Sequence, residues 1–227
     1  MSQTKITVKI FEPLLKNFEK QIEALFIKRD AFLNSVLQVE LKHLAMDMQG
    51  KKLSSKANRY ISGELNKLGA KQVNIVVEQS TADALKDIVN DTNIVRDAFF
   101  NRLILLLRSN TDLLKYLDLP AFINDPEFKS VIDPMPTSPL QAMLEVHNDP
   151  LYYLREGAEE RLKTGLYLIE LPPKLVGFTC YLDDAQVPGT EAYAKSQIEA
   201  ETMLGELLMS FEADAFQKPE IAVEVKS

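Results

Sequence analysis

The chain has 227 residues, of which 46% are hydrophobic and 26% are charged, so it can form a packed core and extensive disorder is not expected. This length suits one large domain or two small ones. Residues 1–110 carry 17 Lys+Arg and 12 Asp+Glu, a net charge of +5, whereas residues 111–227 carry 9 and 21, a net charge of −12. The division predicts a basic front half with an anionic partner and an acidic rear half with a different role.

Few residues are available for metal or nucleophilic chemistry. Cys180 is the only cysteine, and His43 and His147 are the only histidines. A single cysteine excludes an internal disulfide and a cysteine-rich zinc site, and two histidines leave little material for a histidine-based metal site or a catalytic triad. We expect no metal, no cofactor and no enzymatic activity. The longest aliphatic run, residues 103–107, is too short to span a bilayer. Because the first residues also lack an apolar signal segment, we expect a cytoplasmic protein that does not enter a membrane.

An eleven-residue segment occurs twice in the chain, at an offset of 67 residues. Residues 27–37 and 94–104 share six identical positions, and three of the other positions are apolar in both copies. The offset holds upstream without a gap, where the apolar positions correspond: Ile6, Val8 and Ile10 with Val73, Ile75 and Val77. One register across two kinds of pattern favours a true repeat over two amphipathic helices that merely look alike.

Each copy has the same order of local patterns. A period-two alternation comes first, at residues 5–10 and 72–77, and is typical of a strand with one buried face. A helix start, a short break and a second apolar helical stripe follow. We therefore expect two strand–helix–helix units, at about 3–46 and 70–109, whose strands pair as an antiparallel ribbon over four helices.

This repeated unit resembles the ribbon-helix-helix family of DNA-binding proteins, of the Arc, MetJ and CopG type. Two copies in one chain are similar to the tandem arrangement of the conjugation protein TraY. In the family, the ribbon enters the major groove of DNA and alternate strand side chains read base edges. The resemblance implies an α+β fold in which residues 1–110 form a single-chain pseudo-dimer that binds double-stranded DNA.

The resemblance assigns the outward face of the ribbon to base readout. With the apolar alternate residues inward, this face carries six side chains: Lys5, Thr7, Lys9, Gln72, Asn74 and Val76. Lysine can donate to guanine, glutamine and asparagine can pair with adenine, and threonine and valine can contact a thymine methyl group. An ordinary solvated ribbon face is the alternative. Because the two strands differ, we expect two unlike half-sites, one read mainly through charge and one through neutral contacts.

The resemblance also assigns phosphate contacts to the start of each second helix, where free backbone N–H groups and the helix dipole attract anions. The corresponding residues are Lys28, Arg29, Val95 and Arg96. Each arginine could contact a phosphate directly, or could instead pair with the aspartate that follows it or with a nearby helix. Such contacts would position the protein, while the ribbon would specify the sequence.

The remaining segments differ in character from the repeat. Residues 47–69 predict a basic linker with a helix that Ser54 or Ser55 caps, and prolines make residues 118–140 a loop-rich connection. For residues 111–227 we expect a small acidic α+β domain. Its predicted helices lie at about 139–146, 150–163 and 190–211, and its predicted strands at 166–171, 175–182 and 221–225.

Together these features predict sequence-specific binding of double-stranded DNA by a transcriptional repressor or autoregulator. Two alternatives remain open: an accessory DNA-binding protein for plasmid transfer or partition, and an antitoxin-like protein-interaction module. The rear half carries no catalytic motif, and its acidic charge argues against its lying on DNA. We expect it to mediate self-association, or to bind a protein or small-molecule effector.

Overall fold

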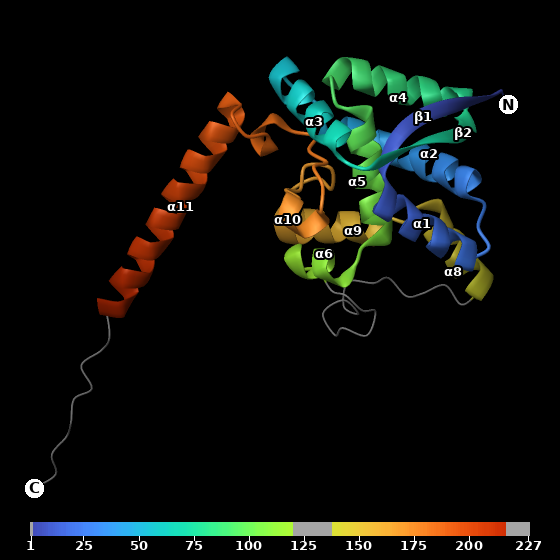
Figure 1. The fold of residues 1–227 in the computed structure, drawn as a ribbon. Helices are drawn as coiled ribbons and strands as arrows, with labels where there is room; N and C mark the ends of the chain where they lie inside the picture. Colours follow the sequence, from blue (N-terminus) through green and yellow to red (C-terminus); the bar gives the residue numbers. More distant parts are fainter. Residues whose placement is uncertain (1, 120–137, 217–227) are drawn as a thin grey trace, which may run out of the picture.

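The computed structural model describes residues 2–119 and 138–216. It is a mixed α+β arrangement, mostly helical, with one small sheet (Figure 1). The front half comprises β1 (Gln3–Phe11), α1 (Glu12–Ala24), α2 (Arg29–Asp47), α3 (Ser55–Lys67), β2 (Ala70–Glu78), α4 (Gln79–Thr92) and α5 (Arg96–Arg108). The described part of the rear half comprises α6 (Thr111–Tyr116), α8 (Pro139–Asn148), α9 (Tyr152–Gly157), the π-helical turn η1 (Ala158–Leu162), α10 (Pro173–Val176), the 3-10 turn η2 (Asp184–Gln186) and α11 (Glu191–Phe216).

β1 and β2 form a two-stranded antiparallel ribbon (Figure 1). Thr7 lies opposite Asn74, and the register continues along the full length of both strands. One face of the ribbon is buried, at 7% exposure or less for Ile6, Val8, Ile10, Val73, Ile75 and Val77. The strand pairing predicted from the repeat is therefore confirmed, since a period of two places these side chains on a single face.

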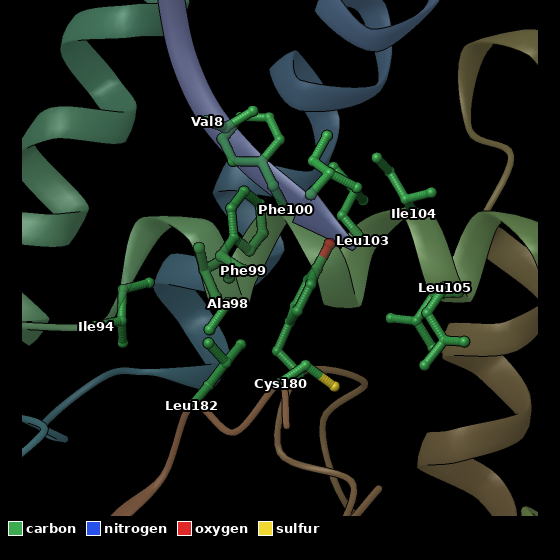
Figure 2. Close-up of a cluster of buried hydrophobic side chains, with 14 of the residues drawn as sticks. Val8, Ile94, Ala98, Phe99, Phe100, Leu103, Ile104, Leu105, Cys180 and Leu182 are labelled. Atoms are coloured by element: carbon green, nitrogen blue, oxygen red, sulfur yellow. The ribbon is translucent and has the colours of Figure 1, made fainter. Parts of the chain in front are cut away.

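The second helix of each copy packs against the strand of the other copy. α2 contacts β2, and α5 contacts β1. α5 is the more deeply buried of the two helices, with no exposed surface at Ala98, Phe99, Phe100, Leu103 and Ile104 (Figure 2). Because each strand is covered by a helix from the other copy, the two repeats share one core instead of forming two small ones.

The linker between the copies contains the predicted helix. The Ser54 hydroxyl oxygen accepts a hydrogen bond from the Ala57 backbone N–H at 3.1 Å, which caps α3. The prediction that Ser54 or Ser55 begins this helix is confirmed. Ala57, Ile61 and Leu65 are buried, and α3 packs against α5.

The predicted helices of the rear half are also observed, with shifted ends. α8 begins at Pro139 as expected, α9 with η1 occupies most of 150–163, and α11 extends the third predicted helix to Phe216. α11 stands away from the rest of the chain (Figure 1) and contacts η2 at its base. Most of the proline-rich stretch 118–140 lies outside the described residues. Across the described ranges, no helix combines the length and apolar character needed to cross a membrane.

The strands predicted at 166–171 and 175–182 are wrong. These segments are irregular apart from the short helix α10, which begins at Pro173, and the described residues of the rear half contain no strand. An apolar run does not by itself distinguish a strand from an irregular segment that packs into a core. The segment inserts its apolar side chains beneath α5, burying Leu166, Tyr167, Ile169, Leu171, Phe178, Cys180 and Leu182. The third predicted strand, 221–225, lies outside the described residues.

Buried side chains replace the missing sheet partners of this segment. Arg102 Nη2 donates hydrogen bonds to the carbonyl oxygens of Leu166, at 3.2 Å, and Ile169. Gln186 Nε2 donates to the carbonyl oxygens of Leu168, at 2.9 Å, and Ile169, at 3.2 Å. Burial lowers the pKa of the Arg102 guanidinium, which has no exposed surface. The carbonyl oxygens of Leu166, Leu168 and Ile169 are thus satisfied without a neighbouring strand.

Further polar contacts join the rear half to α2. Buried Glu40 accepts two hydrogen bonds from Arg155, each at 3.1 Å, and one from the Tyr167 hydroxyl at 2.7 Å. Burial, assisted by the Glu40 carboxylate, raises the pKa of Tyr167. Cys180 is a buried core residue, and burial raises its pKa to about 11. A single hydrophobic core therefore continues across residue 110.

Candidate nucleic-acid interface

The outward face of the ribbon carries the six side chains predicted to read bases. Val76 is half-buried and the other five are exposed. They form three cross-strand pairs: Lys5 with Val76, Thr7 with Asn74, and Lys9 with Gln72. Residues directly opposite each other in an antiparallel ribbon share a face, so the fold brings all six onto one surface.

The central pair of this surface is held in a defined orientation. Thr7 Oγ1 donates a hydrogen bond to Asn74 Oδ1 at 2.9 Å. Arg29 Nη2 donates to the backbone carbonyl oxygen of Asn74 at 3.0 Å. With Oδ1 engaged, the Asn74 amide nitrogen keeps its two donors for an acceptor outside the protein.

A seventh side chain reaches this surface from outside the repeat. Lys9 Nζ donates a hydrogen bond to Asn66 Oδ1 in the last turn of α3, at 3.1 Å, and both residues are exposed. No local sequence pattern marks Asn66, because its place beside Lys9 depends on the direction in which α3 returns to the ribbon.

The free edges of the ribbon are covered by an asparagine from each second helix. The Glu78 backbone N–H donates to Asn34 Oδ1 at 2.9 Å, and the Phe11 backbone N–H donates to Asn101 Oδ1 at 2.8 Å. Both the donors and the acceptors are 67 residues apart, so these two contacts are equivalent. Each asparagine satisfies an edge group that would otherwise lack a partner. Their identity in the two repeats was the signal that could have predicted this role.

In the first copy, three charged residues, Glu19, Arg29 and Asp30, form an ion-paired cluster at the β2 edge that Asn34 contacts. Asp30 Oδ2 accepts a hydrogen bond from the Val76 backbone N–H at 3.1 Å. Arg29 pairs with Asp30 at 2.8 Å and with Glu19 at 2.9 Å. Partial burial alone would lower the pKa of Arg29, but its hydrogen bonds to Asp30 and Glu19 outweigh that effect and raise it. Of the two roles left open for Arg29, the structure shows the pairing with its neighbours.

The second copy lacks an equivalent ion-paired cluster. The Arg96 side chain is 47% exposed and approaches Asp97 only to 4.0 Å. The residue equivalent to Glu19 at the repeat offset is Lys86, which cannot accept a hydrogen bond from a guanidinium. Arg96 is therefore much less engaged than Arg29, and the two predicted phosphate arginines differ.

The starts of α2 and α5 are alike in their backbone. Lys28 and Val95 occupy the N-cap positions, and neither helix start has a side-chain cap. Their carbonyl oxygens accept from the backbone N–H groups of Phe32, at 3.0 Å, and Phe99, at 3.1 Å. The first backbone N–H groups of such helices can donate to an anion. The four predicted phosphate residues thus lie at two helix starts, one beside each strand.

Among residues 2–119 and 138–216, no group of three or more His, Cys, Asp and Glu side chains is arranged to hold a metal ion. Comparison of the chain with protein-family models, with curated proteins and with solved structures found no match.

Proposed function

We propose that this chain binds double-stranded DNA in a sequence-specific manner as a tandem ribbon-helix-helix protein, and that it acts as a transcriptional repressor or autoregulator. The observation that carries the proposal is the outward face of the β1–β2 ribbon, where three cross-strand pairs present donors, acceptors and methyl groups. A two-stranded ribbon fits the major groove, and these residue types match the groups displayed there.

The surroundings of the ribbon support the proposal. Two helix starts without side-chain caps lie beside the strands, and each carries one basic residue that is not held in a close ion pair, Lys28 at α2 and Arg96 at α5. Phosphate contacts at these places would fix the ribbon in register on the duplex. The net charge of +5 over residues 1–110 favours a polyanionic partner.

The proposed test is selection of bound sequences from a random duplex DNA library by the full-length chain. The full chain is required because the core extends across both halves. We expect an enriched site with two unlike half-sites. Asn74→Ala and Thr7→Ala should each relax the preference at about one base pair, whereas Asn90→Ala, at an exposed position on α4, should not. Unchanged preferences in both ribbon variants would refute base readout by this face.

A role in plasmid transfer or partition uses the same DNA-binding surface. A footprint on native DNA separates the two roles, because protection of a promoter favours repression. Protection of a transfer origin or of a centromere-like array favours the accessory role.

A protein-interaction module is the second candidate function, and an apolar groove favours it. The groove has a volume of about 1050 Å³ and lies between α1, α2, α5 and α8. Leu25 and Met143 line it and are 65% and 69% exposed. Exposed apolar surface of this kind is typical of a protein contact. Stoichiometric co-purification of a partner that Met143→Lys abolishes, with no duplex DNA selected, would favour this function.

The proposal includes self-association through the rear half. Ile198, Met203 and Leu204 of α11 are 57–71% exposed on a helix that stands away from the body (Figure 1). Apolar side chains on an isolated helix gain stability by packing against another chain. Sedimentation of the chain with and without Leu204→Lys would measure this contribution.

A further inference from the structure

The two ends of the ribbon differ because the linker helix occurs only once. α3 leads directly into β2 at the end where Phe11 pairs with Ala70. At the other end, where Gln3 pairs with Glu78, the chain continues straight into α4. The repeat therefore makes the two strands equivalent, while the linker places one additional element beside one end only.

The position of α3 is fixed by its packing and by backbone contacts. Ile61 and Leu65 are buried against the core, at 0% and 5% exposure. Asn58 Nδ2 donates to the carbonyl oxygen of Asn93 at 2.8 Å, and the Glu12 N–H donates to the carbonyl oxygen of Gly69 at 3.1 Å. The last turn of α3 is consequently a rigid support for the side chains it presents to the ribbon.

Asn66 uses this support to hold Lys9. The Lys9 ammonium donates to Asn66 Oδ1 at 3.1 Å. A free lysine side chain loses conformational entropy when it is immobilised, so a partner that restrains it beforehand reduces the loss on binding. Lys5, at the other end of the same strand, has no such partner among the described residues.

The pair offers mainly donors to a ligand. Lys9 has no acceptor, and one of its three ammonium protons is used by the Asn66 oxygen, which leaves two ammonium protons and the Asn66 amide N–H groups for external acceptors. Guanine displays two adjacent acceptors, O6 and N7, in the major groove, whereas adenine displays a donor beside its N7. A pair that offers mainly donors therefore favours guanine over adenine.

We propose that Lys9 and Asn66 together read a guanine at one end of the binding site, with Asn66 as the residue that positions the Lys9 ammonium. This inference rests on the proposed function and adds a specificity determinant from outside the repeat. It assigns the strongest guanine preference to the Lys9 end of the ribbon and a weaker preference to the Lys5 end.

The test compares base preferences of full-length variants on duplex DNA. Lys9→Ala and Asn66→Ala should both reduce the guanine preference at the same base pair, by about fivefold or more. Lys9→Ala should also reduce the dependence of affinity on salt by about one counterion, whereas Asn66→Ala should leave it unchanged. Asn90→Ala serves as the matched control, and thermal unfolding should show that Asn66→Ala folds normally.

The possible failures can be told apart. If the unmodified chain selects no duplex sequence, the proposed function itself fails. If it selects a sequence and Asn66→Ala keeps the guanine preference within twofold, or reduces preference equally at all positions, the inference about Asn66 is overturned. A loss confined to the base pair that Lys9→Ala also affects supports it.

Discussion

The two copies of the repeat have the same order of elements, but the arginine at the start of the second helix makes different contacts in each copy. In both copies an asparagine of the second helix accepts from a backbone N–H at the edge of the other copy's strand. In the first copy Arg29 is bound to Glu19, Asp30 and the Asn74 carbonyl oxygen. In the second copy Arg96 makes only a loose approach to Asp97. The asparagines that are identical in the two copies thus make the same contact. The residues around the two arginines differ, so that Arg29 is bound within the protein and Arg96 is more exposed.

The second helix of the second copy, α5, is also more deeply buried than α2, its equivalent in the first copy. α5 lies between the ribbon and the irregular segment of the rear half, whereas the equivalent face of α2 ends at an open groove. Arg102 replaces Ser35 at the repeat offset and carries the contacts to Leu166 and Ile169. The rear half thus contacts α5 through Arg102 and α2 through Glu40 and Asp47. Only the Phe32 end of α2 lies beside the groove, which accounts for the unequal burial of Phe32 and Phe99.

The largest expected effect is on the equivalent phenylalanines of the two second helices. Phe99 has no exposed surface, whereas Phe32 is 9% exposed and lines the groove. Phe99→Ala should lower the free energy of unfolding by about 3–5 kcal/mol, and Phe32→Ala by less, because the groove already admits solvent beside it. Urea unfolding followed by circular dichroism measures both. Equal losses would show that the copies are not buried differently.

A smaller difference is expected between the two edge asparagines. Asn101 has no exposed surface and bonds the Phe11 N–H, the Lys9 carbonyl oxygen and the Asp97 carbonyl oxygen. Asn34 is half-buried and bonds the Glu78 N–H. Asn101→Ala should cost about 2–3 kcal/mol of unfolding free energy, and Asn34→Ala about 1 kcal/mol, since water can reach the second site.

The same unfolding measurement serves for the asparagine variants. Asn101→Asp is the matched control, because it keeps the acceptor for Phe11 and loses both donors. A result in which Asn34→Ala is the more damaging of the two would contradict the assignment of the tighter edge contact to the second copy.

The smallest effects are expected at the equivalent arginines Arg29 and Arg96, where one substitution should change stability and the other should change binding. Arg29→Ala should lower the free energy of unfolding by about 1 kcal/mol, because it breaks partly exposed hydrogen bonds. Arg96→Ala should leave stability nearly unchanged, and under the proposed function it should reduce the salt dependence of DNA binding by about one phosphate contact. Titration of the selected duplex at several salt concentrations gives the second quantity. A salt dependence that changes with Arg29→Ala and not with Arg96→Ala would reverse the roles given to the two copies.

Patterns of short range predicted the front half well. The alternation at 5–10 and 72–77 and the common offset were sufficient for the strands, their pairing and the outward set of side chains. They failed at 166–171, where apolar residues of similar composition pack without a strand. Hydrophobicity indicates that a segment is buried, but it does not indicate which groups form hydrogen bonds with the backbone of that segment. Here the side chains of Arg102 and Gln186 do so, in place of a neighbouring strand.

The sequence by itself determined the repeat, the order of its strand and helices, and the face of the ribbon that is left polar, because these follow from contacts within a few residues and from burial of one face. Only the tertiary structure decided that each second helix packs on the other copy's strand, that Arg29 is engaged while Arg96 is much less so, and that Asn66 lies beside Lys9. Such contacts join residues 10 to 92 positions apart. Hydrogen bonds over these separations produce no periodic pattern in the sequence from which they could be predicted.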